Sequence, residues 1–176
     1  MAHEEHRHAA PRSVTAAILV VSDTRSEATD RSGKRIRELL EAGGHHVLSL
    51  DVVRDEREDI ASWVRRTSSR PELDVLILTG GTGISPRDVT IEAVEPLFHV
   101  HLPGFGELFR ALSFHEIGAA AMLSRASAGV VRGRSVACFC LPGSRPAVEL
   151  ALEKLILPEI GHLILEIRKG TSHGTH

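Results

Sequence analysis

Cysteine and aromatic residues are scarce in this sequence, which has two cysteines, no tyrosine and only 3% aromatic residues. Cys138 and Cys140 lie two positions apart in an apolar segment, so on a strand they point to the same face, a geometry that suits a disulfide poorly. We therefore expect two small buried residues and nothing that requires an oxidising compartment. The shortage of aromatic rings also argues against the stacking platforms that bind single-stranded nucleic acids.

The sequence also lacks a strong net charge and any long apolar run. Its 21 basic and 23 acidic residues give a formal net charge of −2, so electrostatics favour neither a nucleic-acid backbone nor an anionic membrane as a partner. No apolar run approaches the roughly 20 residues that span a bilayer, and the amino terminus carries no apolar signal segment. We therefore expect a cytoplasmic protein that binds neither nucleic acid nor membrane.

What the sequence does contain is the composition of a globular domain, with 42% hydrophobic and 25% charged residues. A chain of 176 residues is long enough to bury a core without disulfides. Residues 1–13 and 170–176 lack an apolar pattern, and we expect both to be disordered tails. The sequence thus predicts one domain, at residues 14–169.

Hydrophobic patterning within this domain predicts alternating strands and helices. Three apolar segments have the length of strands in a parallel sheet that is buried on both faces: they are Ala16–Val21, His46–Val53 and Asp74–Leu78. Helical spacing follows each of them, beginning near Asp30, near Asp55 and at Val89. Three strand–helix units in succession predict an α/β fold, a three-layer sandwich around a mostly parallel, doubly wound sheet.

The second half of the domain is less regular. Helical spacing over Glu107–Ile117 predicts a further helix. Two apolar segments joined through Gly133 predict a short hairpin or edge strand: they are Ala126–Val131 and Ser135–Leu141. An apolar pattern from Ala147 to Ile167 is interrupted by Pro158, which predicts two carboxy-terminal helices.

Polar clusters follow the three predicted parallel strands, beginning at Ser22, at Asp55 and at Thr79. Because open α/β sheets bind ligands beyond the carboxyl ends of their strands, we expect these clusters to meet in one pocket. The turn Gly80-Gly81-Thr82-Gly83 offers backbone N–H groups to an anion, although it lacks the P-loop lysine. The sequence therefore predicts binding of a phosphorylated small molecule.

Asp55 and Asp88 each follow a strand and precede a helix, and two interpretations stay open. The first is that both are helix N-caps, each contributing about 1 kcal/mol. The second is that both carboxylates lie at one pocket and hold Mg²⁺ against a polyphosphate. Ser124-Arg125 and Pro142-Gly143-Ser144 are further candidates for phosphate contacts, with a solvated arginine and a plain helix start as the alternatives.

The order of several motifs resembles the MoaB and MogA family of molybdenum cofactor biosynthesis proteins, over about residues 14–168. The motifs are SDTR at Ser22–Arg25, DRSG at Asp30–Gly33, VVRDE at Val52–Glu56, TGGTGISPRDVT at Thr79–Thr90, PGFGELFR at Pro103–Arg110, MLSRASAG at Met122–Gly129 and LPGS at Leu141–Ser144. One departure is that a proline often follows LPGS directly in the family, whereas Arg145 intervenes here.

The resemblance implies a Rossmann-like, molybdopterin-binding fold. It also implies adenylylation of the terminal phosphate of molybdopterin by Mg-ATP, with release of pyrophosphate. Asp55 and Asp88 are then the catalytic residues that hold Mg²⁺. The implied assembly is a homo-trimer or homo-hexamer that can contact other proteins of the pathway. The alternatives are a non-catalytic molybdopterin-binding protein and an oligomeric interaction protein. The predicted substrate contacts are Ser22, Asp23, Thr79, Gly80, Gly81, Thr82, Gly83, Ser85, Ser124, Arg125, Pro142, Gly143 and Ser144.

Overall fold

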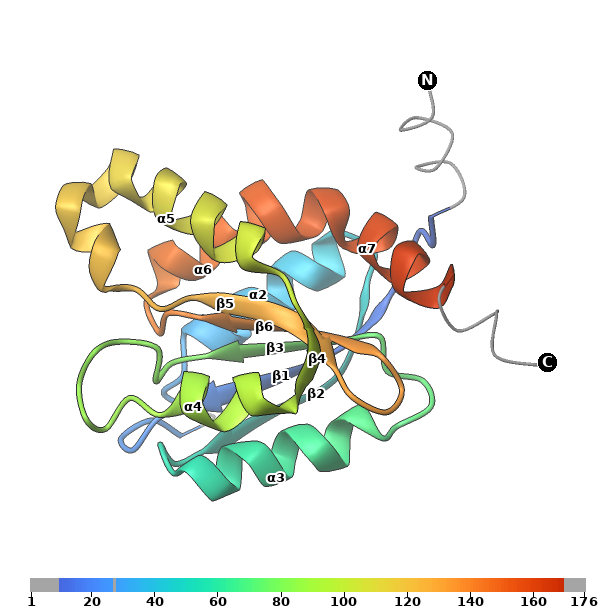
Figure 1. Ribbon diagram of the computed structural model, residues 1–176, viewed down its shortest axis with the longest axis horizontal. Helices are drawn as coiled ribbons and strands as arrows, with labels where there is room; N and C mark the ends of the chain where they lie inside the picture. The colour runs from blue at the N-terminus through green and yellow to red at the C-terminus, as the bar shows by residue number, and fades with distance from the viewer. Residues whose placement is uncertain (1–9, 27, 170–176) are drawn as a thin grey trace.

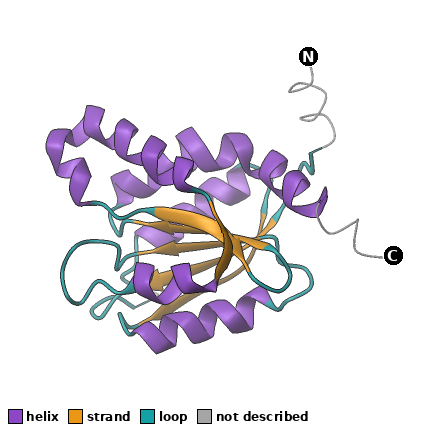
Figure 2. Ribbon diagram, in the orientation of Figure 1, coloured by secondary structure: helices purple, strands orange, loops and turns teal. Residues whose placement is uncertain are grey.

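Figure 1 shows the chain as a computed structural model, which describes residues 10–26 and 28–169. Six strands form one sheet in the order β2-β1-β3-β6-β5-β4, with helices on both faces (Figures 1 and 2). This arrangement confirms the predicted three-layer α/β sandwich. The expected tails lie outside the described residues, except for residues 10–13. Of these, Pro11 lies against the carboxy-terminal helix, where its carbonyl oxygen is 2.7 Å from the point that a Cβ on Gly161 would occupy.

The centre of the sheet is parallel, as the apolar segments predict. β1 (Thr15–Val21) pairs with β2 (His46–Val53) and with β3 (Val75–Thr79), and β3 pairs with β6 (Val136–Leu141). Every residue of β3 and β6 is buried, which explains their uninterrupted apolar sequences. Because Val20, Thr79 and Leu141 are in register across the three strands, the chain leaves β1, β3 and β6 at one edge of the sheet.

Alternate side chains of the central strands enter two separate cores. Ile18 and Ile77 pack beneath α2 (Ser32–Ala42), α5 (Pro103–Ile117), α6 (Arg145–Ala151) and α7 (Leu157–Lys169). Leu19 and Leu78 pack on the other face, beneath α3 (Arg57–Ser68) and α4 (Thr90–Val94). Cys138 and Cys140 share that second face as free, buried thiols, as expected. None of the described helices is long and apolar enough to cross a membrane.

The predicted hairpin is present, and it carries an edge strand that the sequence pattern does not predict. β5 (Ser127–Val131) runs antiparallel to β6. β4 (Phe98–His101), which follows the short helix η1 (Glu95–Leu97), pairs antiparallel with β5. Only Phe98 of β4 is buried, and its ring occupies the space that a side chain at Gly129 would need. Four residues with three exposed side chains are too short a pattern to recognise as a strand.

The helices of the second half depart from prediction at two places. α5 begins four residues early because Pro103 is at its first turn, where a proline needs no N–H partner, and the short helix η2 (Gly118–Leu123) follows it. The expected break at Pro158 is wrong. α6 and α7 are joined without interruption by one wider, π-helical turn, η3 (Leu152–Ile156). Pro158 cannot donate to the carbonyl four residues earlier, and the wider turn ends two residues before it.

Candidate functional site

A pocket of about 520 Å³ opens at the carboxyl edge of the sheet. It lies where the chain turns from β1 to one neighbour, β2, and later to the other, β3, which is the switch point of a doubly wound sheet. All three predicted polar clusters contribute to it. The lining residues are Val21, Ser22, Asp23, Thr24, Arg25, Asp55, Gly80, Gly81, Thr82, Gly83, Asp88, Leu123, Ser124, Pro142, Gly143 and Ser144.

The glycine turn is held tightly against its surroundings. Gly80 and Gly81 have φ angles of +101° and +64°, which glycine adopts far more readily than other residues. A Cβ on Gly80 would overlap the carbonyl oxygen of Val21, and one on Gly81 would overlap Oγ1 of Thr90. Thr90, fully buried, donates its hydroxyl to Gly80 O at 2.8 Å and its N–H to Gly81 O at 3.0 Å. Both positions therefore require glycine.

The backbone N–H groups of this turn are available to a ligand. Those of Gly81, Thr82 and Gly83 donate to no acceptor among the described residues. Successive unpaired N–H groups in a turn of this kind can form an anion-binding concavity. The turn can therefore bind phosphate oxygens.

The turn after β6 forms the adjacent wall. The point that a Cβ on Gly143 would occupy is 3.3 Å from Gly80 Cα, so the two glycine segments are in contact. Thr79 lies behind the pocket and donates its hydroxyl to Pro142 O at 2.8 Å. Gly143 O accepts bonds from Ser32 Oγ at 2.8 Å and Arg25 Nη1 at 3.1 Å.

Asp55 is the buried acid of the site, with 9% of its surface exposed. Its Oδ1 accepts the N–H of Val89 at 3.3 Å, and the point that a Cβ on Gly81 would occupy is 2.8 Å from the same oxygen. Burial raises the pKa of Asp55, and the nearby charges of Asp88 and Asp23 add to the rise, whereas the Val89 N–H and Arg87 oppose it.

Neither aspartate is the N-cap of its own helix, so that interpretation is wrong. α3 is preceded by Glu56 and α4 by Val89, and neither helix start has a side-chain cap. Asp88 instead accepts the N–H of Ser85 on Oδ2 at 2.9 Å, and this oxygen lies 2.8 Å from the point that a Cβ on Gly83 would occupy. The two carboxylates thus contact the glycine turn at two points and line the same pocket.

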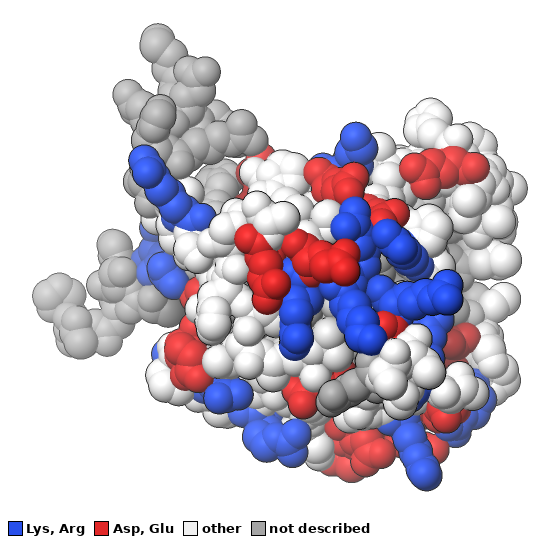
Figure 3. Space-filling model, turned by 180° about the vertical axis from the view of Figure 1, so that it is seen from behind, with Lys and Arg blue, Asp and Glu red and all other residues white. Residues whose placement is uncertain are grey.

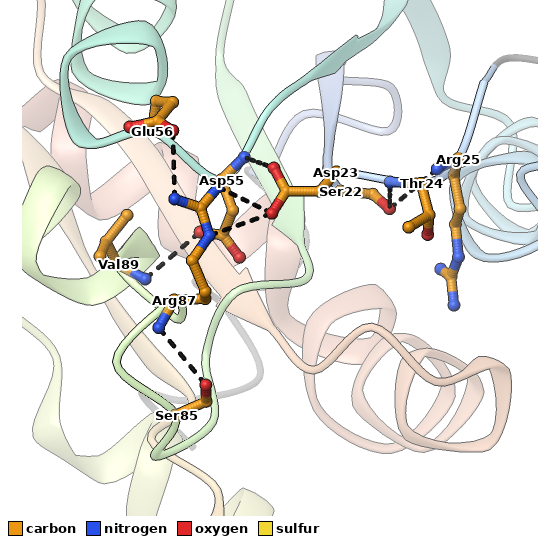
Figure 4. A network of polar contacts seen from close by, with 9 residues as sticks. All are labelled: Ser22, Asp23, Thr24, Arg25, Asp55, Glu56, Ser85, Arg87 and Val89. Carbon is orange, nitrogen blue, oxygen red and sulfur yellow. Dashed lines mark hydrogen bonds and ion pairs between the residues drawn. The ribbon is translucent and has the colours of Figure 1, made fainter.

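An ion-pair network joins the loops that surround Asp55 (Figure 4). Asp23 accepts two bonds from Arg87 on Oδ2, at 3.1 and 2.7 Å, and the N–H of Asp55 on Oδ1 at 3.1 Å. Arg87 also donates to Glu56 at 3.1 Å. The hydrogen bonds from Arg87 and from the Asp55 N–H lower the pKa of Asp23. The network therefore connects the loops that follow β1, β2 and β3.

Some predicted contacts lie beside the pocket without lining it. Ser85 accepts the N–H of Arg87 on its hydroxyl at 3.3 Å. Arg125 donates to backbone carbonyls of the glycine loop, whereas its neighbour Ser124 lines the pocket. Ser32 and Thr90 are not among the predicted site residues, and they support the two glycine segments from behind. The only sequence signal for them was their place within the DRSG and TGGTGISPRDVT motifs.

Basic side chains gather in a second hollow, of about 530 Å³, which is lined in part by Arg31, Lys34, Arg35 and Arg145. Figure 3 shows the face seen from behind Figure 1, where basic and acidic side chains are interleaved. Two of the basic side chains that line this hollow are paired with an acid beside it, because Arg35 and Arg145 both donate to Glu149, at 2.7 and 3.0 Å. Arg145, which departs from the family pattern, therefore lines this hollow and is not among the residues that line the pocket at the switch point.

Fold and pocket together define a doubly wound α/β protein with a glycine turn and two carboxylates at its switch point. Residues 17–162 match the family described as "Probable molybdopterin binding domain". The chain is 50% identical to "Molybdenum cofactor biosynthesis protein B" of Halalkalibacterium halodurans, over 96% of this chain and 99% of that protein. The chain belongs to the MoaB/MogA family of molybdenum cofactor biosynthesis proteins, as the motifs predict.

Solved structures agree with this assignment. A crystal structure of a "Molybdenum cofactor biosynthesis protein B" is similar with a TM-score of 0.86 and 48% identity, covering 91% of this chain and 99% of that chain. The "tungsten cofactor synthesizing protein MoaB" of Pyrococcus furiosus is similar with a TM-score of 0.81 and 38% identity, covering 90% and 99%.

Proposed function

We propose that this protein binds molybdopterin and transfers the adenylyl group of ATP to its terminal phosphate, with release of pyrophosphate. The observation that carries the proposal is the meeting of Asp55, Asp88 and the glycine turn in one pocket. Molybdopterin as the ligand is supported by the match to a family described as a probable molybdopterin binding domain. Phosphate oxygens of either substrate are suitable acceptors for the N–H groups of the turn.

The proposed reaction forms one bond and breaks one. An oxygen of the terminal phosphate of molybdopterin attacks the α-phosphorus of ATP. The bond from that phosphorus to the oxygen bridging to the β-phosphate breaks, and pyrophosphate leaves with the electron pair. Because the attacking phosphate is already anionic at neutral pH, no general base is required. The protein then has to hold two phosphorylated substrates in line and offset their charge.

The two aspartates fit a magnesium ion bound together with ATP. In proteins Mg²⁺ is held by one or two carboxylates together with substrate phosphates and water. Asp55 and Asp88 each keep one carboxylate oxygen, Oδ2 and Oδ1 respectively, that accepts no hydrogen bond from the described residues. Among the residues that the structure describes, no group of three or more His, Cys, Asp or Glu side chains could hold a metal ion. We therefore assign this pair to the cation, which when bound supplies charge neutralisation for the phosphates.

The test is to incubate the pure protein with molybdopterin, ATP and Mg²⁺ and to measure adenylyl-molybdopterin and pyrophosphate. Asp55→Asn and Asp88→Asn should each lower the rate by about 100-fold or more. Asp59→Asn is the matched control, because Asp59 is an exposed acid in the first turn of α3 and should leave the rate unchanged. If the unaltered protein forms no product while an active family member does, catalysis is excluded.

Binding of molybdopterin without chemistry is the second candidate function. The observation that favours it is that each aspartate already has a structural role, as the acceptor of a backbone N–H. This candidate predicts saturable molybdopterin binding that survives both asparagine substitutions, with no consumption of ATP in any form.

We also propose, from the resemblance, a cytoplasmic homo-trimer or homo-hexamer that can contact other proteins of the pathway. Large apolar side chains exposed on α5 and η2 support self-association; they are Leu108, Phe114, Ile117, Met122 and Leu123. Light scattering on the protein as it elutes from a size-exclusion column distinguishes monomer, trimer and hexamer. An interaction protein with a vestigial pocket would form the oligomer yet show no saturable binding of molybdopterin or ATP.

A further inference from the structure

Arg125 lies two residues before the start of β5 and reaches across to the loop that carries Asp88. Its backbone N–H donates to Thr82 O at 3.1 Å, and its Nε donates to Gly83 O at 2.8 Å. At the far end of the same loop, its Nη2 donates to Asp88 O at 2.9 Å. One residue therefore fastens both ends of the loop.

The direction of the guanidinium is itself fixed. Glu92, in the first turn of α4, accepts bonds from Nη1 and Nη2 of Arg125, and this hydrogen bonding lowers the pKa of Glu92. The planar fork of an arginine presents Nε and Nη donors in a rigid arrangement, so one side chain can bind two carbonyls and a carboxylate together. A lysine at this position has a single nitrogen and cannot reproduce that set.

Between these two ends the loop has another attachment through a side chain, the bonds that Arg87 donates to Asp23 and Glu56. Ile84, Ser85, Pro86 and Arg87 are exposed, and 68% of the surface of Ile84 is in contact with solvent. Within the loop, Ser85 and Asp88 bond to each other through both backbone and side chain, which makes the turn compact but does not attach it to the rest of the protein. The bonds of Arg87 attach the loop through exposed side chains, whereas the bonds from Arg125 attach its backbone directly.

We propose that Arg125 is a positioning residue, which acts through the backbone of Gly83 and Asp88 to hold the Asp88 carboxylate at the pocket. The consequence for catalysis rests on the proposed adenylyl transfer; the consequence for the loop does not. Arg125 was expected to contact phosphate directly, and the two roles predict different outcomes.

The experiment compares Arg125→Ala and Arg125→Lys with the unaltered full-length chain. Arg134→Ala is the matched control, because Arg134 also donates to a backbone carbonyl, Pro71 O at 3.0 Å. Arg134 does not line the pocket at the switch point and lies outside the loop that carries Asp88. Hydrogen–deuterium exchange of residues 85–90 measures the attachment of the loop without any ligand. Steady-state kinetics then give kcat and KM for molybdopterin.

Loss of the arginine bonds should speed exchange of these amides by about tenfold in Arg125→Ala, and less in Arg125→Lys. It should also lower kcat by about 100-fold, since a misplacement of about 1 Å costs this much, while KM for molybdopterin changes by less than about threefold. Arg134→Ala should match the unaltered protein in every measurement.

Unchanged exchange would overturn the proposal, as would faster exchange with unchanged kcat. A rise in KM alone, with unchanged exchange, would instead assign Arg125 to direct phosphate contact. If the unaltered protein forms no adenylyl-molybdopterin, the proposed function fails, and the exchange measurement alone then decides whether Arg125 holds the loop.

Discussion

Substituting Gly81 with alanine tests whether the glycine turn is as tightly constrained as its contacts indicate. Gly81 has a φ of +64°, and a Cβ there would overlap Thr90 Oγ1 and lie 2.8 Å from Asp55 Oδ1. Thr90 has no exposed surface and its hydroxyl is the donor to Gly80 O, so rotation of the side chain would break that bond. The overlap therefore cannot be relieved without cost.

Two contributions make up the expected loss of stability. The left-handed conformation costs an alanine about 1–2 kcal/mol. Relief of the overlap, with loss of the buried Thr90–Gly80 bond, costs about another 2 kcal/mol. Alanine also restricts the unfolded chain, which offsets about 0.4–1 kcal/mol of this loss of stability. We therefore expect Gly81→Ala to lower the free energy of unfolding by about 3 kcal/mol.

Gly44→Ala isolates the second contribution. Gly44 has a φ of +82°, but a Cβ there would have no heavy atom within 4 Å. Both variants therefore share the cost of the left-handed backbone and the gain from the restricted unfolded chain, and only Gly81→Ala adds the overlap with Thr90. The difference between them should be about 2 kcal/mol, or about 4–8 °C in Tm, measured by urea and thermal unfolding followed by circular dichroism. Equal destabilisation by the two substitutions would refute the overlap at Gly81.

Two further predictions concern buried polar groups. Burial raises the pKa of Asp55 above its ordinary value of 3.8, so the ionised carboxylate lowers the stability of the folded protein. This loss is absent below pH 3.8, where the group is protonated in both the folded and the unfolded state, and it is complete above the folded pKa. Asp55→Asn should therefore raise Tm at pH 7 and leave it unchanged at pH 3; a gain that persists at pH 3 would contradict this cause. Trp63, which is 2% exposed, donates from Nε1 to Asp51 at 3.0 Å, so Trp63→Phe should cost about 2 kcal/mol through the lost charge-assisted bond, measured by urea unfolding. Asp51→Asn, which keeps an acceptor, is the control and should cost less.

Most of the sheet was predictable because its strands are buried on both faces. β1 and β3 were predicted within one residue at each end, since a strand covered by helices on both sides excludes polar residues. β4 was not predictable, because its exposed residues have no strand pattern and the strand exists through pairing with β5. The π-helical turn between α6 and α7 was not predictable for a related reason, since a proline normally ends a helix and here tertiary packing continues it.

The candidate site was predictable in outline only. Polar residues at the carboxyl ends of parallel strands indicated that Asp55, Asp88 and the glycine turn would meet, and the pocket contains all of them. The sequence left open whether the aspartates cap helices, because an N-cap and a pocket residue occupy the same place in a strand–turn–helix unit. The decisive partner of Asp55 is Val89, which is 34 positions away.

The sequence by itself determined the alternation of strands and helices, the glycines of the turn and the segments that follow each strand. These depend on burial periodicity and backbone freedom, which are local properties. Only the tertiary structure decided what the charged groups do: Arg125 supports the loop of Asp88, and Arg87 joins the loops after β1 and β2. Such bonds join residues more than 30 positions apart, and their geometry exists only after packing has set the strand order.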